Sequence, residues 1–140
     1  EERSFTVTVE AGTTPLSSAQ AFTWERVGGA AATGLDQFGL SWTSNSATSA
    51  IVAQDAATVM VELSAADWTN ITTQEDLATA IDNGTSITEY RGVSAQQNDT
   101  YNDVLAVRHN GTDYILNIQQ GTVTTGGSGT TIVIEGEYKN

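Results

Sequence analysis

Alternation of apolar and polar residues is the feature that most restricts what this chain can fold into. In residues 4–10, Phe5, Val7 and Val9 alternate with serine, threonine and glutamate. Successive side chains of a β-strand point to opposite faces of a sheet, so this pattern predicts a strand with one buried face. The same pattern recurs in residues 21–27, 37–43, 57–63 and 130–138.

The fold class follows from the number of these stretches and from the turn signals between them. Threonine occurs 22 times among the 140 residues, and its branched β-carbon suits a pleated surface. The sequence therefore predicts an all-β fold, a β-sandwich or jelly roll of about seven to nine strands. It shows no internal repeat and no domain boundary, so residues 1–140 are expected to form a single domain.

One short helix is expected within this fold, around residues 73–82. Residues 72–75 have the spacing of a capping box, and Asn83-Gly84 supplies a stop signal. A shorter helical turn is expected in residues 64–70. The apolar stripe of the main helix consists of Leu77, Ala78, Ala80 and Ile81.

Asn110-Gly111 is the strongest turn signal in the sequence. Both residues tolerate positive φ, so the pair predicts a two-residue hairpin turn in which His109 faces Thr112. His109 is the only histidine, and its place at the hairpin tip explains it without a catalytic role. The register that follows places Val107 opposite Tyr114, Leu105 opposite Leu116, and Arg108 opposite Asp113.

The charge of the chain excludes several classes of partner. Seventeen acidic residues face five basic ones, and the formal net charge is −12. Phosphate binding requires clusters of lysine and arginine, so neither nucleic acid nor an anionic membrane surface is an expected partner. No apolar run is long enough for membrane insertion. Cysteine is absent, which excludes disulfides and thiol nucleophiles.

No motif in the sequence predicts a reaction, so we expect a protein that is not an enzyme. A Ser-His-Asp triad would have to use His109, and no Gly-x-Ser-x-Gly motif is present. The glycine-rich residues 126–129 lack the lysine of a phosphate-binding loop and precede a strand rather than a helix. A small hydrolase with two paired carboxylates remains a third hypothesis, because seventeen acids offer many pairs.

One cluster has the donor atoms that calcium prefers. Asn98, Asp99, Asn102 and Asp103 bring two carboxylates and two amides close together in the sequence. Their spacing does not match an EF-hand loop, and a solvated loop is the simpler interpretation. We therefore expect no obligatory cofactor, with calcium at these four residues as the alternative.

The sequence also contains features that suit carbohydrate. Four Asn-x-Thr sequons, at Asn70, Asn83, Asn98 and Asn110, are candidate N-glycosylation sites of a glycoprotein. Trp68 lies near the short helical turn and is the candidate for an exposed aromatic that stacks on a sugar. The alternative function is therefore a carbohydrate-binding or adhesin-type module, with calcium as its stabilising ion.

The N-terminal residues carry the leading hypothesis about function. The alternating residues 4–10 are followed by a break at residues 12–15. A terminal strand separated by such a break can complete its own sheet or that of a neighbouring subunit. The chain begins Glu1-Glu2 without a methionine, which fits either a processed protein outside the cytoplasm or a chain that has been trimmed at its N-terminus.

The sequence thus favours a non-enzymatic structural subunit that self-assembles. We expect a pilus-like extracellular filament or a virion component, located outside the cell, at the cell surface or in a virion. Residues 4–10 would be the exchanged strand, and Phe5, Val7 and Val9 would lead the contact between copies.

Overall fold

The computed structural model describes residues 3–4, 13–27, 33–44, 49–127 and 129–140. Phe5, Val7 and Val9 of the expected N-terminal strand lie outside the described residues. In chain order the elements are β1 (Gln20–Val27), the 3₁₀ helix η1 (Asp36–Phe38), β2 (Leu40–Ser44), β3 (Ser49–Ala53), β4 (Val59–Leu63), α1 (Asp67–Asn70), α2 (Gln74–Asn83), β5 (Ser86–Ile87), β6 (Glu89–Tyr90), β7 (Asp99–His109), β8 (Thr112–Gly126) and β9 (Gly129–Lys139).

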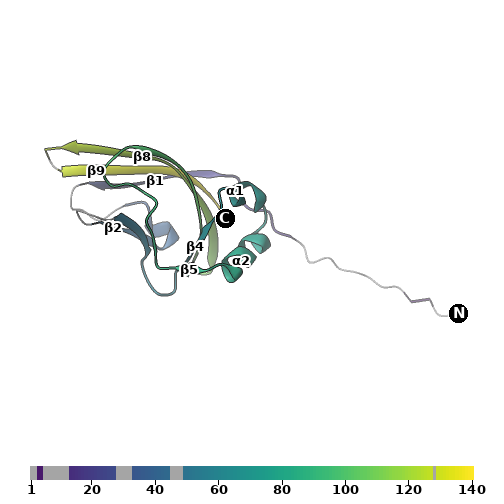
Figure 1. Cartoon of the computed structure of the whole chain (residues 1–140). Helices are drawn as coiled ribbons and strands as arrows, with labels where there is room; N and C mark the ends of the chain where they lie inside the picture. Colours follow the sequence, from purple (N-terminus) through teal and green to yellow (C-terminus); the bar gives the residue numbers. More distant parts are fainter. Residues whose placement is uncertain (1–2, 5–12, 28–32, 45–48, 128) are drawn as a thin grey trace.

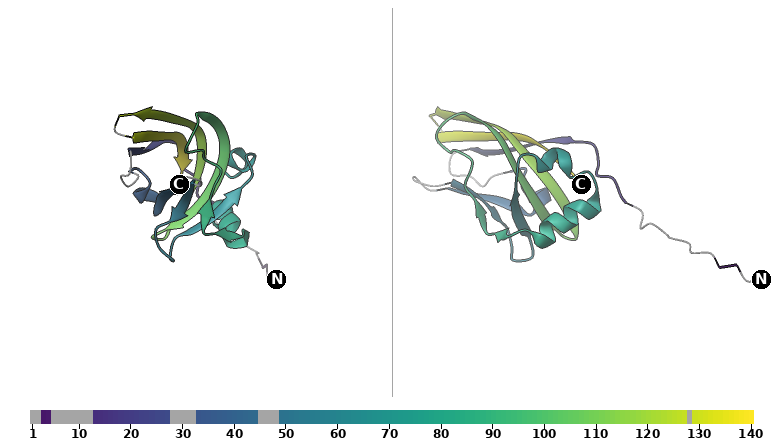
Figure 2. Two further views of the ribbon diagram at one scale, coloured as in Figure 1. Left: turned by 60° about the vertical axis from the view of Figure 1, so that its left-hand side comes forward. Right: turned by 45° about the vertical axis from the view of Figure 1, so that its right-hand side comes forward.

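The described strands form two antiparallel sheets, which confirms the predicted all-β sandwich. The large sheet has the strand order β1-β9-β8-β7-β4-β5, and the small sheet has the order β2-β3-β6. The three longest strands, β7, β8 and β9, lie side by side within the large sheet, which curves around the small one (Figure 1, Figure 2). In the described part of the chain, no helix is long and apolar enough to cross a membrane.

The two sheets are joined on one side of the sandwich and open on the other. On the joined side only Thr88 separates β5 from β6, so the chain passes directly from the large sheet to the small one. On the opposite side β1 and β2 are both edge strands. The rings of Trp24 in β1 and Trp42 in β2 have their centroids 4.6 Å apart. We call the region between β1 and β2 the open side.

The main core fills the space between the sheets. In β1 the side chains of Phe22 and Trp24 are buried there, while the residues between and beside them are exposed. Phe38 of η1 lies at the centre of an aromatic cluster, with ring centroids 5.3 Å from Phe22, 5.2 Å from Tyr114 and 5.1 Å from Tyr138. Edge-to-face contacts of this kind each contribute about 1 kcal/mol beyond the burial of the rings. They hold η1 against the large sheet.

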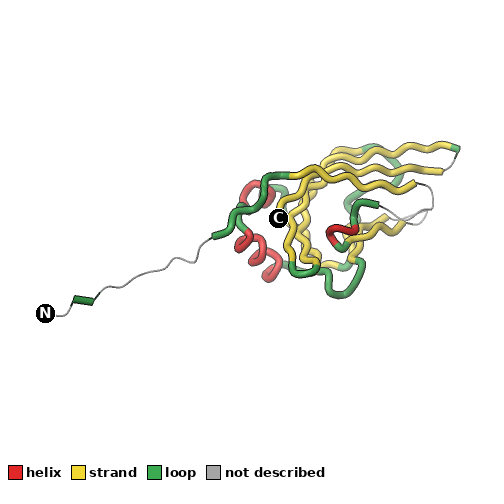
Figure 3. Tube along the Cα trace, turned by 180° about the vertical axis from the view of Figure 1, so that it is seen from behind, coloured by secondary structure: helices red, strands yellow, loops and turns green. Residues whose placement is uncertain are grey.

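A second core lies on the outer face of the large sheet, under the helices. Leu77 and Ile81 of α2 pack there with Val104 and Ala106 of β7 and Ile115 of β8. Figure 1 and Figure 3 show α1 and α2 together beside the large sheet. The central strands β7 and β8 are therefore buried on both faces. The molecule has three layers, namely the small sheet, the large sheet and the helices.

The main helix matches its prediction except at its first turn. Thr73 Oγ1 caps α2 by accepting a hydrogen bond from the Asp76 backbone N–H at 3.1 Å. The N-cap is thus Thr73, one residue after the Thr72 that the capping box predicted over residues 72–75 requires. Its expected glutamate, Glu75, instead accepts hydrogen bonds from the backbone N–H of Thr14. The expected shorter helical turn is α1.

The β7–β8 hairpin has the predicted register. His109 faces Thr112, and the three pairs predicted farther from the tip are also found. Asn110 has φ 50° and Gly111 has φ 76°, as a two-residue turn of this type requires. The turn chemistry of two residues thus specifies the pairing of the two central strands.

Gly39 separates η1 from β2, which shortens the strand predicted over residues 37–43. Gly39 has φ 66°, a left-handed conformation that favours glycine. A β-carbon at this position would collide with the imidazole of His109. The imidazole Nδ1 in turn lies 3.0 Å from Thr58 Oγ1. His109 therefore packs the hairpin tip against the start of β2.

The substitution Gly39→Ala should destabilise the protein more than Gly111→Ala. Both force alanine into a left-handed conformation, which costs roughly 1–2 kcal/mol. At Gly39 the added methyl group also meets His109, whereas at Gly111 it meets nothing within 4 Å. Overpacking of this kind adds about 1–3 kcal/mol, so urea denaturation should separate the two variants by at least about 1 kcal/mol. Equal losses would contradict the packing of His109 on Gly39.

Candidate functional site

On the open side, some backbone groups of β2 point away from their own sheet. The Gln54 backbone N–H donates to the Gly39 carbonyl at 2.8 Å, which marks these residues as a hydrogen-bonded pair. In an antiparallel ladder such pairs alternate with pairs that exchange no hydrogen bonds. Trp42 and Ile51 form a pair of the second kind, so the N–H and C=O of Trp42 point away from β3. Among the described residues no backbone group pairs with them.

The facing edge of β1 is more fully covered. Glu25 and Thr33 exchange two backbone hydrogen bonds, of 3.1 and 2.9 Å, along this edge. The next residue, Gly34, packs directly against the backbone of β1. The Leu35 carbonyl then accepts a hydrogen bond from the Leu40 N–H at 3.2 Å, at the start of β2. The part of β2 beyond Leu40 is therefore the more open edge.

Two buried indole groups at the open side lack hydrogen-bond partners. Trp24 is fully buried, and Trp42 is 8% exposed. Within the described ranges, neither Nε1 atom has an acceptor. A buried N–H left unpaired costs about 1–3 kcal/mol. Two of the three buried side-chain atoms without a partner in the described ranges therefore lie where the two edge strands face each other, and the third, Asn117 Oδ1, lies on β8.

The segment of residues 14–17, which precedes β1, is anchored beside the helices. The Gln74 N–H donates to the Thr14 carbonyl at 2.8 Å, and the Leu16 N–H donates to the Thr72 carbonyl at 2.9 Å. These bonds attach the segment to the N-terminal end of α2. The sequence did not predict this anchor, because nothing in residues 12–17 signals a partner in a helix far along the chain.

Two more contacts fix the same segment. The Ser17 N–H donates to the Asn140 carbonyl at 2.7 Å. The Thr14 N–H donates to both carboxylate oxygens of Glu75, at 3.1 and 2.9 Å, and lowers the pKa of Glu75 by favouring its ionised form. This contribution to stability is present above the usual glutamate pKa and is lost as the pH falls through the lowered value. Residues 14–17 are therefore held in place by hydrogen bonds to α2 and to the last residue of the chain.

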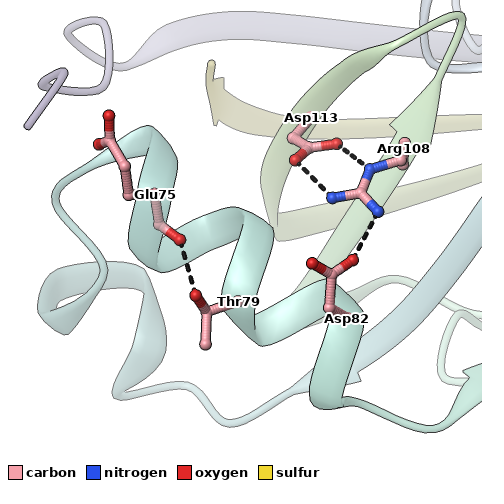
Figure 4. Close-up of polar contacts among 5 residues, drawn as sticks. All are labelled: Glu75, Thr79, Asp82, Arg108 and Asp113. Carbon is pink, nitrogen blue, oxygen red and sulfur yellow. Dashed lines mark hydrogen bonds and ion pairs between the residues drawn. The ribbon is translucent and has the colours of Figure 1, made fainter.

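Arg108 connects the hairpin to the helix layer (Figure 4). Its Nε and Nη2 donate to the Asp113 carboxylate at 2.6 and 3.0 Å, which confirms the predicted cross-strand pair. Its Nη1 also donates to Asp82 of α2 at 2.7 Å, a contact that the hairpin register alone did not predict. The hydrogen bonds to the two carboxylates raise the pKa of Arg108. In the same view Thr79 Oγ1 donates to the Glu75 carbonyl at 3.0 Å, within α2.

Three of the four residues of the candidate calcium site use a side-chain oxygen in a hydrogen bond within the protein, and the fourth, Asn102, is exposed. Asn98 Oδ1 accepts from a backbone N–H of β8 at 2.7 Å, and Asp99 Oδ1 accepts from the next N–H of its own strand at 2.8 Å. Asn102 is exposed where the β7–β8 register shifts, and Asp103 Oδ2 accepts from the Tyr90 hydroxyl. In the described part of the chain no three His, Cys, Asp or Glu side chains are placed to hold a metal. Calcium at these residues stays a prediction.

Asp103 is the acidic residue closest to what the hydrolase hypothesis requires. Burial raises the pKa of Asp103, and the nearby charge of Glu62 raises it further. The Tyr90 hydroxyl donates to it, and Gly92 packs against both groups. Asp103 lines neither of two shallow surface depressions, of about 230 and 290 Å³, formed by described residues. Neither Asp103 nor Glu62 lines either depression. The two depressions therefore give the hydrolase hypothesis no support.

The sequon asparagines all lie at element ends or tips. Asn70 ends α1, Asn83 ends α2, Asn98 directly precedes β7, and Asn110 lies at the hairpin tip. All four are exposed. These positions are accessible to a modifying group, and glycan attachment stays a prediction.

Trp68, the candidate sugar-stacking residue, is half-buried. Its side chain packs against the second core, and Lys139 Nζ lies 4.1 Å from the centroid of its ring. The same ammonium donates to the Trp68 carbonyl at 2.6 Å. Burial lowers the pKa of Lys139, against the opposing effect of Glu137. Because the ammonium covers one face of the ring, less of Trp68 is left for a ligand.

Comparison with protein-family models, with curated proteins and with solved structures finds no match for this chain. Functional inference therefore rests on the open edge of β2, the unpaired indoles and the anchored segment before β1.

The pH dependence of stability should carry a component from Asp103. Because its pKa is raised in the folded protein, the folded state binds this proton more tightly than the unfolded state. The contribution is complete below about pH 3.9, the usual aspartate value, and is lost as the pH rises through the raised pKa. Asp103→Asn should therefore weaken the fall in stability with rising pH.

Urea denaturation over the acidic to neutral range would measure this slope. Asp99→Asn is the matched control, because it removes the same charge from an exposed position of the same strand. We expect Asp99→Asn to keep the slope of the unmodified protein. Identical slopes for Asp103→Asn and the unmodified protein would contradict the effect of burial at Asp103.

Proposed function

We propose that this chain is a non-enzymatic structural subunit that assembles with copies of itself by β-strand complementation. The product would be a pilus-like extracellular filament or a virion component. The proposal rests mainly on β2, where the backbone groups of Trp42 point away from the sheet and have no backbone partner in the described ranges. An edge of this kind is a template for a strand from another chain.

β2 is the best acceptor among the described edge strands. Its five residues, Leu40–Ser44, include no charged residue and no proline, the two residue types that commonly protect an edge. β5 and β6 have only two residues each, and the edge of β1 is bonded at Glu25. An added strand at β2 would also bring backbone carbonyls to the side where the indoles of Trp24 and Trp42 lack acceptors.

Residues 4–10 are the donor in this proposal. Their alternation suits a strand with one apolar face, and that face contains Phe5, Val7 and Val9. The described residues that follow are anchored beside α2, so a donated strand would connect to a fixed base.

Removal of residues 1–11 should abolish assembly and leave a folded monomer. The anchor bonds of Thr14, Leu16 and Ser17 remain in this variant, so the segment before β1 stays attached to the sandwich. Light scattering and negative-stain microscopy would compare the two chains in the same buffer. We expect large particles or filaments from the intact chain only. An intact chain that stays monomeric at high concentration would refute the proposal.

A charge on β2 should weaken assembly without unfolding the subunit. Thr43 is exposed on this edge strand, and Gln120 is exposed on β8 where that strand pairs with both β7 and β9. Thr43→Lys should reduce the particle size measured by light scattering, because charged side chains on an edge oppose strand addition. Gln120→Lys makes the same change in net charge and should assemble normally. Equal assembly by both variants would exclude β2 as the acceptor.

A further inference from the structure

Asn83 and Asn110 begin the same tripeptide, Asn-Gly-Thr, in two different structural settings. Glycine has no β-carbon, so its backbone nitrogen is the least hindered nucleophile for the amide of a preceding asparagine. We propose that Asn110 is a site of intramolecular deamidation, and that the folded structure protects Asn83 from the same reaction. This inference is independent of the proposed function.

The reaction at Asn110 needs only water. The Gly111 nitrogen gives its proton to solvent and forms a bond to Asn110 Cγ. The Cγ–Nδ2 bond then breaks, and Nδ2 leaves as ammonia after receiving a proton, which closes a succinimide ring. Water adds to one of the two ring carbonyls and opens the ring to aspartate or isoaspartate. One water is consumed, one ammonia is released, and no oxidation or reduction takes place.

The hairpin tip leaves the nucleophile free. Asn110 and Gly111 are both exposed, and a β-carbon on Gly111 would meet nothing within 4 Å. The ladder of the hairpin closes at the pair His109 and Thr112, one residue outside the turn on each side. In the described part of the chain no backbone group accepts from the Gly111 N–H. Water and base can therefore reach the nitrogen that attacks.

His109 touches the leaving group. Its Nε2 lies 3.1 Å from Asn110 Nδ2, and its Nδ1 lies 3.0 Å from Thr58 Oγ1. The contact with Thr58 and the close packing on Gly39 hold the ring in this position. An amide N–H donates, so the Nε2 lone pair accepts from Asn110 Nδ2 in this contact. His109 thus acts as a positioning residue that holds the Asn110 side chain at the turn, and water supplies the proton with which Nδ2 leaves as ammonia.

The equivalent nitrogen after Asn83 is held in the helix. The Gly84 N–H donates to the Ala80 carbonyl at 3.0 Å, the hydrogen bond that ends α2. Gly84 also packs against the side chain of Val61, where a β-carbon would overlap it. Attack on Asn83 would require this hydrogen bond to break first, at a cost of about 1 kcal/mol. The same tripeptide is therefore reactive in the turn and protected at the helix end.

Deamidation at Asn110 has two chemical consequences. It replaces the amide next to His109 with a carboxylate, which adds one negative charge at the hairpin tip. It also destroys the sequon Asn110-Gly111-Thr112. A chain that has reacted at Asn110 can no longer receive a glycan there, and a glycan on Nδ2 would block the loss of ammonia.

Peptide mapping of the aged protein tests the proposal. The full chain is incubated in native buffer and, in parallel, in urea, and is then cleaved after Arg26, Arg91 and Arg108, which places Asn83 and Asn110 on separate peptides. In native buffer Asn110 should convert about tenfold faster than Asn83, and in urea the rates should converge. A rate at Asn83 equal to that at Asn110 in native buffer would overturn the proposal. So would a preference that persists unchanged in urea.

Two variants test the roles of the neighbouring residues. Gly111→Ala places a methyl group beside the attacking nitrogen and should slow conversion at Asn110 while leaving Asn83 unchanged. His109→Gln removes the ring nitrogen that holds the Asn110 side chain and should slow conversion at Asn110 about fivefold in native buffer, the equivalent of one hydrogen bond of about 1 kcal/mol, with no effect in urea. A native rate that is unchanged in His109→Gln would refute the role of His109. If that variant merely unfolded, Asn83 would rise to its urea rate in the same digest.

Discussion

The burial of β7 and β8 on both faces is the constraint on which the rest of this structure depends. Residues 104–107 are four consecutive buried apolar residues, so alternate side chains of one strand need cover on opposite sides. The small sheet covers one face and α2 covers the other. Arg108 then ties the hairpin of these two strands to both Asp113 and Asp82, so that the helix layer is joined to the sheet by charge as well as by packing.

Part of the hydrogen-bonding capacity that is unmet among the described residues lies on the open side. The joined side is crossed by the chain that passes from β5 to β6. On the open side the backbone groups of Trp42 point away from β3, and two indoles have no acceptor within the described ranges. Edges exposed in this way favour strand addition. A donor on an anchored N-terminal segment would fit that need, and this is the physical content of the assembly proposal.

Local chemistry explains what could be predicted about the fold, and distant contacts explain what could not. The hairpin register was correct because Asn110 and Gly111 specify their own turn. The cap of α2 was displaced by one residue because Glu75 bonds to Thr14, which lies 61 residues away. The candidate site was predicted less well, because the open side depends on the ladder register of β2 and on the segment that covers β1, and neither leaves a local signal.

The sequence by itself determined the strand-rich architecture, the central hairpin, the helix predicted around residues 73–82 and the acidic net charge. These properties follow from period-two alternation, turn chemistry and composition, each of which acts over a few residues or over the chain as a whole. Only the tertiary structure decided which edge stays open and which of two identical Asn-Gly-Thr tripeptides has a free nucleophile. The reason is that hydrogen-bond partners and packing neighbours are supplied by segments far apart in the sequence, so identical residues acquire different chemistry once the chain has folded.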